Sequence, residues 1–507
     1  MFVYRRFEST MMMVMGYVFM LLGAALLVPG FIAMGLGESY GPFLSIVPFL
    51  MLMGALLIVL FRQDDSFKPI QGLLLVLVVW VVVFVVGMIP YVILGMSPLD
   101  SMFESVSGFT TTGSTIMSDI ESWPMSLLVW RSMTQWMGGI LVIIIFLYIL
   151  PMVSTGRTVF SNELSGSGSS EYTIRMGRAA KSFILVYAFL SLLNYLLIVA
   201  CGVEWLEALC MVFSTISTGG LMCTQDSLSS YSVWVEVVTI LFMFLGGTNF
   251  YLHYTALVKR TFKPYRTNSE FRTNVLWFLG ISVIIFVMLL ISEQNLDLDH
   301  VMSEYKLFID VGFTVVSIGT STGFTVTDYG LFPAQCIIML MLVGFIGASA
   351  GSTAGGIKLG RIHIIYQSIR TRMARTVSPS MVTRVKVDKD TLDHDMVLSA
   401  FSVMVMFIGT LLVGAILIMM CGYDIVDSVG LAIASLGNVG VAFGNFGPSG
   451  DMSVLEEQVK VLMMILMWVG RLEVITALVF FTPTFWREVM ADHRANRREN
   501  ASRRQKS

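Results

Sequence analysis

Long apolar stretches separated by short polar ones make up most of this chain. Ten of them lie at about 10–34, 42–61, 70–95, 124–150, 180–202, 232–258, 274–292, 333–368, 396–421 and 458–482. Each can cross the hydrocarbon core of a bilayer, which takes roughly 20 residues of α-helix. The pattern predicts ten crossings, and an even number places both termini on the same side of the membrane.

Four shorter apolar stretches stand between these spans, and each ends in a turn rich in small residues. In every copy an acidic residue stands thirteen positions before a glycine, at 100/113, 207/220, 310/323 and 427/440. Irregular backbone at membrane depth is tolerated only where it is buried in protein or lines a watery cavity. One such stretch could be a helix with a glycine cap, but four copies at one offset favour four walls around one axis.

Composition supports a membrane protein. The 507 residues are 56% hydrophobic and only 13% charged, whereas about a quarter of the residues of a soluble protein are charged. The five cysteines are scattered without a C-x-x-C pair, which argues against a disulfide or zinc framework.

Basic residues are sorted by side. They crowd the connections 151–181, 259–272 and 358–389 and the C-terminal tail, while 203–236 and 421–457 contain no Lys or Arg. The positive-inside rule therefore predicts that both termini and the basic loops are cytoplasmic, so that all four half-length stretches enter from outside.

The sequence contains no nucleophile elbow, H-E-x-x-H pair, phosphate loop or dinucleotide fingerprint. The run Gly351–Lys358 is superficially like a phosphate loop, but Leu359 stands where Ser or Thr would follow the lysine. We therefore predict that the chain is not an enzyme, needs no cofactor and binds no nucleic acid.

Five runs carry a specific likeness: Ser105–Gly113, Gln135–Gly139, Ser317–Phe324, Gly351–Lys358 and Gly470–Glu473. They resemble motifs of the Trk/Ktr/HKT superfamily of potassium transporters, and its Trk-type membrane subunits above all. The resemblance covers nearly the whole chain. It implies a single-file pore of four pseudo-repeats in a homodimer, controlled by a cytosolic nucleotide-binding ring of the TrkA type.

The resemblance also assigns the potassium-binding filter to the four turns. Its residues are Thr110, Thr111, Thr112 and Gly113; Thr218, Gly219 and Gly220; Ser321, Thr322 and Gly323; and Asn438, Val439 and Gly440. Either Gly219 or Gly220 could match Gly113, and the acidic offset favours Gly220. Because all four glycines are present, the resemblance favours potassium over sodium as the substrate.

The glycine-rich run 344–356 interrupts the span 333–368. Several glycines destabilise a helix by roughly 1 kcal/mol each relative to alanine, so we expect an unwound, movable loop rather than close packing of small residues. The resemblance implies a gate at these residues, namely Gly347, Ala348, Ser349, Ala350, Gly351, Ser352 and Thr353.

Arg471 lies within the last apolar span, with Glu473 nearby. A charge facing lipid is costly, so this side chain should face water or a partner. It could lock the bundle through an internal ion pair. The alternative, which the resemblance favours, is a fixed positive charge below the filter that belongs to the gate.

We therefore expect an all-α polytopic membrane protein with four helix–pore-helix–helix repeats around a central pore. Its predicted segments are an N-terminal helix pair (1–68), four repeats (69–178, 179–268, 269–390 and 391–490) and a basic tail (491–507). The expected function is gated potassium uptake across the cytoplasmic (inner) membrane, driven mainly by membrane potential. Proton- or sodium-coupled symport, an integral membrane enzyme and a non-conducting scaffold are the alternatives.

Overall fold

A computed structural model describes residues 6–61, 69–149, 169–293, 304–378, 384–388 and 390–491. Nearly all of the predicted basic tail lies outside these residues. Among the described residues, the regular elements are helices apart from one two-stranded hairpin. It divides into two compact units, with unit 1 comprising Met1–Ser105, Trp123–Trp130 and Ile475–Ser507, and unit 2 comprising Val106–Ser122 and Arg131–Val474.

Unit 1 is built on the predicted N-terminal helix pair. Its helices are α1 (Arg6–Leu36), α2 (Gly41–Leu44), α3 (Val47–Leu60), α4 (Pro69–Gly87) and α5 (Ile89–Ile93), with the first residues of α6 and α7 and most of α21 (Val474–Val479). Helix α1 packs along α3 at two glycines, where a Cβ atom on Gly54 would lie 2.7 Å from Gly16 O. Small residues allow this close approach of two membrane helices.

Unit 2 contains the four half-length helices. These pore half-helices are the end of α6 (Pro98–Phe109), α10 (Trp205–Ile216), α15 (Glu304–Gly319) and α19 (Ile425–Leu436). The longer helices are α7 (Met125–Ile149), α9 (Ser169–Ala200), α11 (Val233–Gly246), α14 (Ser269–Glu293), α16 (Ala334–Ile346), α17 (Leu359–Val377), α18 (His394–Met420) and α20 (Glu457–Arg471).

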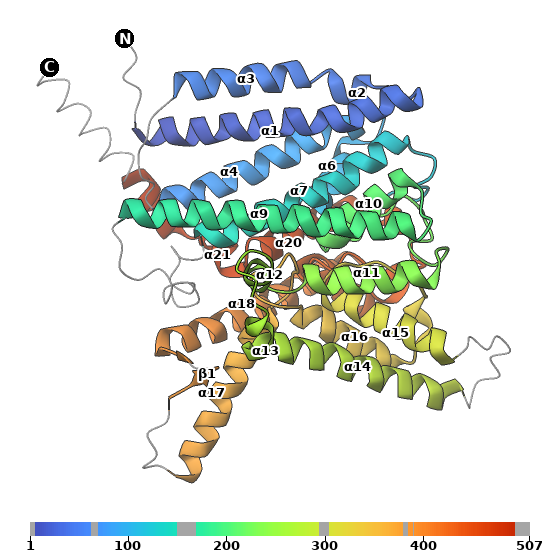
Figure 1. Cartoon of the computed structure of the whole chain (residues 1–507), viewed down its shortest axis with the longest axis vertical. Helices are drawn as coiled ribbons and strands as arrows, with labels where there is room; N and C mark the ends of the chain where they lie inside the picture. Colours follow the sequence, from blue (N-terminus) through green and yellow to red (C-terminus); the bar gives the residue numbers. More distant parts are fainter. Residues whose placement is uncertain are drawn as a thin grey trace, which may run out of the picture. The chain divides into compact units, whose positions relative to one another are not determined.

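Short elements complete unit 2. They are α12 (Phe250–Leu257), α13 (Lys263–Thr267), the antiparallel strands β1 (Lys386–Val387) and β2 (Asp390–Thr391), and the 3-10 turns Tyr329–Leu331, Gly444–Phe446 and Met452–Val454. Helices α9, α11 and α14 run in roughly the same direction, while α17 and the hairpin stand at one end of the unit (Figure 1).

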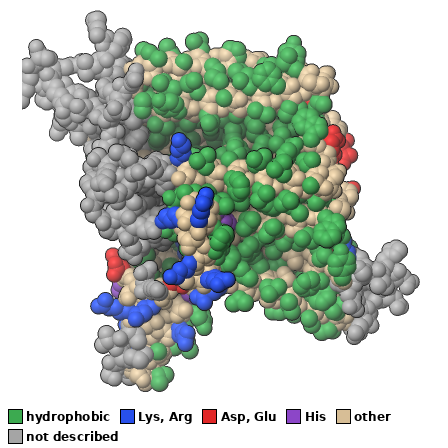
Figure 2. Space-filling model, in the orientation of Figure 1, with side chains coloured by type: hydrophobic (Ala, Val, Ile, Leu, Met, Phe, Trp, Pro, Cys, Tyr) green, Lys and Arg blue, Asp and Glu red, His purple; other side chains and the backbone are tan. Residues whose placement is uncertain are grey.

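Within the described residues, seven helices are long and apolar enough to cross a membrane, or eight if the bent pair α11 and α12 is one span. Many of their large apolar side chains are exposed, such as Leu52 (71%) on α3 and Leu276 (68%) on α14. Figure 2 shows apolar side chains covering much of one face. The chain is therefore a multi-pass membrane protein, and the predicted all-α fold class is confirmed.

Two of the predicted spans are not continuous helices. The span 232–258 breaks between α11 and α12 with a bend of 101°, and the span 458–482 breaks between Arg471 and Val474. The first break follows Gly246 and restarts at Asn249, whose side chain accepts a hydrogen bond from Tyr251 N as an N-cap. Hydropathy averaged over a whole span detects neither break, although the charged residues Arg471 and Glu473 stand at the second one.

The span 333–368 is also interrupted. Helix α16 ends at Ile346 and α17 begins at Leu359, and the backbone between them is not helical. Three glycines in this stretch have positive φ, namely Gly347, Gly351 and Gly356. We call residues 347–358 the intramembrane loop. Its form matches the unwound segment that the glycine-rich run predicts.

Candidate functional site

The four pore half-helices end in the same backbone conformation. Each has a left-handed residue after its last turn, with φ between 50° and 56°, and a glycine two positions later, with φ between 81° and 90°. The left-handed residues are Thr111, Thr218, Ser321 and Asn438, and the glycines are Gly113, Gly220, Gly323 and Gly440. The four-residue segments ending at these glycines are called filter turns one to four.

The left-handed residue, not the glycine, ends each helix. In each turn one residue lies between the left-handed residue and the glycine. Its N–H group donates to the carbonyl oxygen five positions earlier, as Thr112 N does to Ser107 O at 2.9 Å. This is the 6→1 bond of a Schellman helix end. Positive φ at a β-branched residue such as Thr111 is strained, and strain of this kind is typical of functional sites. The glycines therefore have a role beyond capping.

The backbone decides the register of turn two. Gly220 has the positive φ of the other three glycines, while Gly219 does not. Gly219 thus occupies the place of Thr112, Thr322 and Val439 in the other turns. All thirteen residues predicted for the filter lie in these turns.

The four turns meet in a closed ring. Gly113 faces the carbonyl oxygen of Gly219, Gly220 faces that of Thr322, Gly323 faces that of Val439, and Gly440 faces that of Thr112. In each pair a Cβ atom on the glycine would come within 3.0 Å of the oxygen, which real Cβ atoms essentially never do. Each repeat therefore touches the next in cyclic order, and glycine is required at every junction.

Side chains tie the ring together where turns four and one meet. The Asn438 amide donates to Thr112 Oγ1 at 2.8 Å, and Ser114 Oγ donates to Gly440 O at 2.7 Å. No group of three or more His, Cys, Asp or Glu side chains that could hold a metal ion occurs among the described residues. The turns offer main-chain and hydroxyl oxygens, which suit a cation that sheds its water and leaves again.

The intramembrane loop lies against three of the four filter turns. Its Gly355 N donates to Ser321 Oγ of turn three at 2.6 Å, and its Thr353 hydroxyl accepts from Thr218 Oγ1 of turn two at 3.2 Å. A Cβ atom on Gly355 would also lie 3.1 Å from Cβ of Asn438 in turn four. The predicted gate residues Gly347, Ala348, Ser349, Ala350, Gly351, Ser352 and Thr353 all belong to this loop.

The break between α11 and α12 receives the loop. Ser349 N donates to Gly247 O at 3.1 Å, and Phe250 N donates to Gly351 O at 3.0 Å. Thr353 Oγ1 lies within hydrogen-bonding distance of Gly246 O, at 3.0 Å. A continuous helix over 232–258 would use these backbone groups internally, so the bend supplies the partners that the loop needs.

Arg471 holds the loop from the other side. This side chain is 7% exposed, and its Nη1 donates to Thr353 O at 2.6 Å. Its Nε and Nη2 have no hydrogen-bond partner in the described protein. Glu473 instead pairs with Arg361 of α17 at 2.6 Å. The possible lock between Arg471 and Glu473 is therefore not formed, and within the described part of the chain the Arg471 guanidinium takes part in no ion pair.

Comparison with known proteins gives the family. The profile of the TrkH family, described as a cation transport protein, matches residues 47–488. The chain belongs to the TrkH family. It is 32% identical over 428 residues to the Trk system potassium uptake protein TrkH of Halomonas elongata, covering 82% of this chain and 86% of that protein.

Two further TrkH proteins extend the likeness to nearly the full length. TrkH of Escherichia coli K12 is 29% identical over 485 residues, covering 94% of this chain and 98% of that protein. The crystal structure of the potassium transporter TrkH from Vibrio parahaemolyticus matches with a TM-score of 0.85 at 26% identity, covering 94% of this chain and 99% of that one. The predicted resemblance is confirmed.

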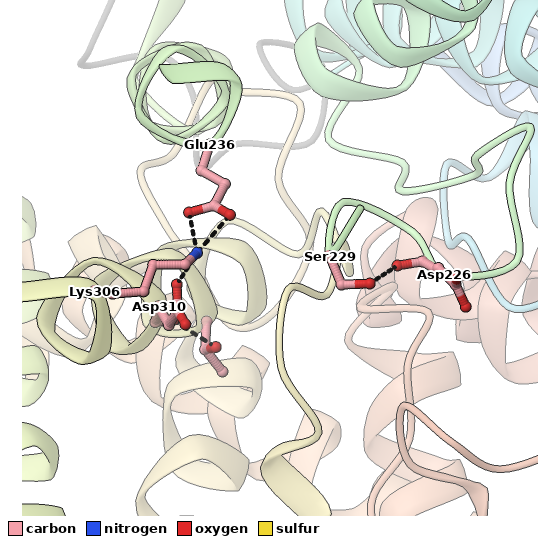
Figure 3. A network of polar contacts seen from close by, with 6 residues as sticks. Asp226, Ser229, Glu236, Lys306 and Asp310 are labelled. Atoms are coloured by element: carbon pink, nitrogen blue, oxygen red, sulfur yellow. Dashed lines mark hydrogen bonds and ion pairs between the residues drawn. The ribbon is translucent and has the colours of Figure 1, made fainter. Parts of the chain in front are cut away.

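In this TrkH-family chain, three of the four acidic residues that mark the repeats anchor the half-helices. Lys306 Nζ lies 2.6 Å from one carboxylate oxygen of Asp310 and 2.6 and 2.7 Å from the two of Glu236, so that α15 is tied to α11 (Figure 3). Glu207 accepts from Tyr231 Oη at 3.0 Å, and Asp427 accepts from Asn445 N at 2.8 Å. These carboxylates are engaged in positioning the helices.

Two contact residues of the site have no role predicted from the sequence, although Gln135 begins one of the runs that carry the family likeness. Glu270, at the start of α14, accepts from Ala350 N of the loop at 2.7 Å. Gln135 lies beside filter turn two and is fully buried. A polar residue within an apolar span was the available signal for Gln135, but its partner lies in another repeat.

Proposed function

We propose that this chain is the pore-forming subunit of a potassium uptake system. The closed ring of filter turns is the observation that supports this most strongly, because four facing carbonyls can replace the hydration shell of a monovalent cation. The TrkH relatives named as potassium uptake proteins favour potassium as the ion. Uptake would be driven mainly by membrane potential, which supplies about 2.3 kcal/mol per charge per 100 mV.

The proposed gate is the intramembrane loop together with Arg471. The loop touches filter turns two, three and four from one side. A guanidinium bound to the loop carbonyl of Thr353 adds a positive charge on that side, which opposes the passage of a cation. Conduction then requires the loop to leave its place.

We further propose that the chain lies in the inner membrane and that the basic end of unit 2 faces the cytoplasm. Exposed Lys and Arg side chains gather around α13 and α17 (Figure 2). The exposed basic residues there include Lys259, Arg260, Lys263, Arg266, Arg370, Arg372 and Arg375. Lys358 connects the intramembrane loop directly to α17. A cytosolic nucleotide-binding ring of the TrkA type that moves α17 would therefore open the gate. The proposed assembly is a homodimer of this chain with such a ring.

Growth of a bacterial strain that lacks potassium uptake tests the proposed function. The chain should restore growth at low external potassium, whereas the same chain with Gly113→Asp should not, because the Cβ atom of the new side chain would overlap Gly219 O. Both proteins must be present in the membrane in equal amounts. Absence of rescue by the parent, or equal rescue by the variant, would contradict the proposal.

A further inference from the structure

The four filter turns are not braced in the same way. In turn one the hydroxyls of Thr110 and Thr112 lie 2.7 Å apart, and Thr110 Oγ1 also donates to Val106 O at 2.7 Å. Since a hydroxyl has one proton, Thr112 must donate to Thr110. Turn three repeats this arrangement with Thr320, Thr322 and Val316. Each of these turns is thus fixed to its own half-helix.

Turn two lacks half of this brace. Ser217 stands in the place of Thr110 and donates to Phe213 O at 2.6 Å, but Gly219 stands where Thr112 does. The space of the missing side chain is filled from another repeat. A Cβ atom on Gly219 would lie 2.6 Å from Nε2 and 2.7 Å from Oε1 of Gln135, a residue of α7.

Gln135 holds turn two on both sides of Gly220. Its Nε2 donates to Gly219 O at 2.6 Å, and its Oε1 accepts from Leu221 N at 3.1 Å. One turn of α7 earlier, Arg131 Nη1 donates to Met222 O at 3.0 Å. One face of α7 therefore binds successive backbone groups of the segment 219–222.

We propose that Gln135 is a positioning residue for ion selectivity, and that its amide replaces in turn two the hydroxyl pair of turns one and three. Gly219 and Gly220 are consecutive glycines, the most freely rotating pair of residues. Gly219 O is also one of the four oxygens of the ring. An amide donor behind this oxygen fixes the peptide plane in a wall where glycine stands in the place of Thr112.

The inference rests on the proposed function and concerns selectivity, not folding alone. A filter distinguishes potassium from sodium through the number and placement of its carbonyls. Without the Gln135 amide, the 219–220 peptide can rotate, and the ring then accommodates a smaller ion. Turn four depends less on such help, since Asn438 Nδ2 binds both Thr112 Oγ1 and Met467 O.

Reversal potentials of the protein in liposomes under opposed potassium and sodium gradients test this inference. We expect Gln135→Ala and the similarly sized Gln135→Met to lower the potassium-to-sodium permeability ratio about tenfold, or roughly 1.4 kcal/mol, the scale of one hydrogen bond. Gln135→Met fills most of the same space without a hydrogen-bond donor, so it separates hydrogen bonding from packing. Gln458→Met, on the exposed start of α20, is the matched control and should leave the ratio unchanged.

A variant that places the threonine pair of turn one in turn two tests whether the hydroxyl pair can replace the Gln135 amide. Adding Ser217→Thr and Gly219→Thr to Gln135→Ala should restore the ratio, because residue 219 does not need positive φ. Gly219→Thr with Gln135 in place should abolish conduction, because the two side chains overlap.

The inference is overturned if the parent is selective and both Gln135 variants are equally so, or if the triple variant is unfolded or no more selective than Gln135→Ala. If Gln135→Ala alone fails to fold while the triple variant folds and is selective, the inference is supported. A parent that carries no potassium current refutes the proposed function instead.

Discussion

Gly323→Ala should reduce potassium uptake at least ~100-fold. The new Cβ atom would overlap the carbonyl oxygen of Val439 in the neighbouring turn, and the backbone at residue 323 has a φ of +82°. Left-handed backbone costs a residue with a side chain about 1–2 kcal/mol, and displacement of a ring carbonyl adds to that cost. Loss of ~2.8 kcal/mol of transition-state stabilisation corresponds to 100-fold. Potassium or rubidium flux into liposomes measures the effect.

Gly312→Ala is the matched control. Gly312 belongs to the same half-helix, α15, and a Cβ atom there would meet nothing within 4 Å. Alanine in a helix is favoured over glycine by about 1 kcal/mol, so uptake should be retained and stability should not fall. Parental flux through the Gly323→Ala protein would show that the ring junctions are not the filter.

Arg471→Ala should raise potassium flux roughly tenfold in the absence of any cytosolic partner. At an effective dielectric constant of about 20, a unit charge acts on another ~10 Å away with ~1.7 kcal/mol, which is more than tenfold in rate. The substitution also removes the hydrogen bond from Nη1 to Thr353 O, which holds the loop against the turns. Both effects favour conduction.

Arg471→Lys separates these two effects from a loss of structure. Lysine keeps the positive charge, so flux should stay near that of the parent. Arg266→Ala, an exposed basic residue on α13, should leave flux unchanged. Flux through Arg471→Ala that is equal to or lower than the parental flux, at equal amounts of reconstituted folded protein, would remove Arg471 from the gate.

The repeat and its half-helices were predictable because their signals are local. Apolar length separates half-helices such as α10 and α19 from spans, and the acidic residue and the glycine keep one offset in all four copies. The conformation of Gly220 follows the same offset. The sequence therefore predicts the positions of the filter turns along the chain, whereas their contact in space is a finding of the structure.

The breaks and braces depend on contacts between distant segments. The run Gly246–Asn249 contains a cap signal, but only the loop residues Ser349 and Gly351 explain why the helix opens there. Glu473 stands near Arg471 in sequence and yet pairs with Arg361. Gln135 is recognisable only beside Gly219, because the missing side chain at that position is what makes room for it.

Crystals grown in rubidium or thallium salts, with anomalous diffraction to locate the ions, test the central claim directly. One monovalent ion should lie on the axis enclosed by the four filter turns, in contact with main-chain oxygens from all four. The absence of an ion there, with ions bound elsewhere in the membrane-embedded part, would contradict a filter made by these turns.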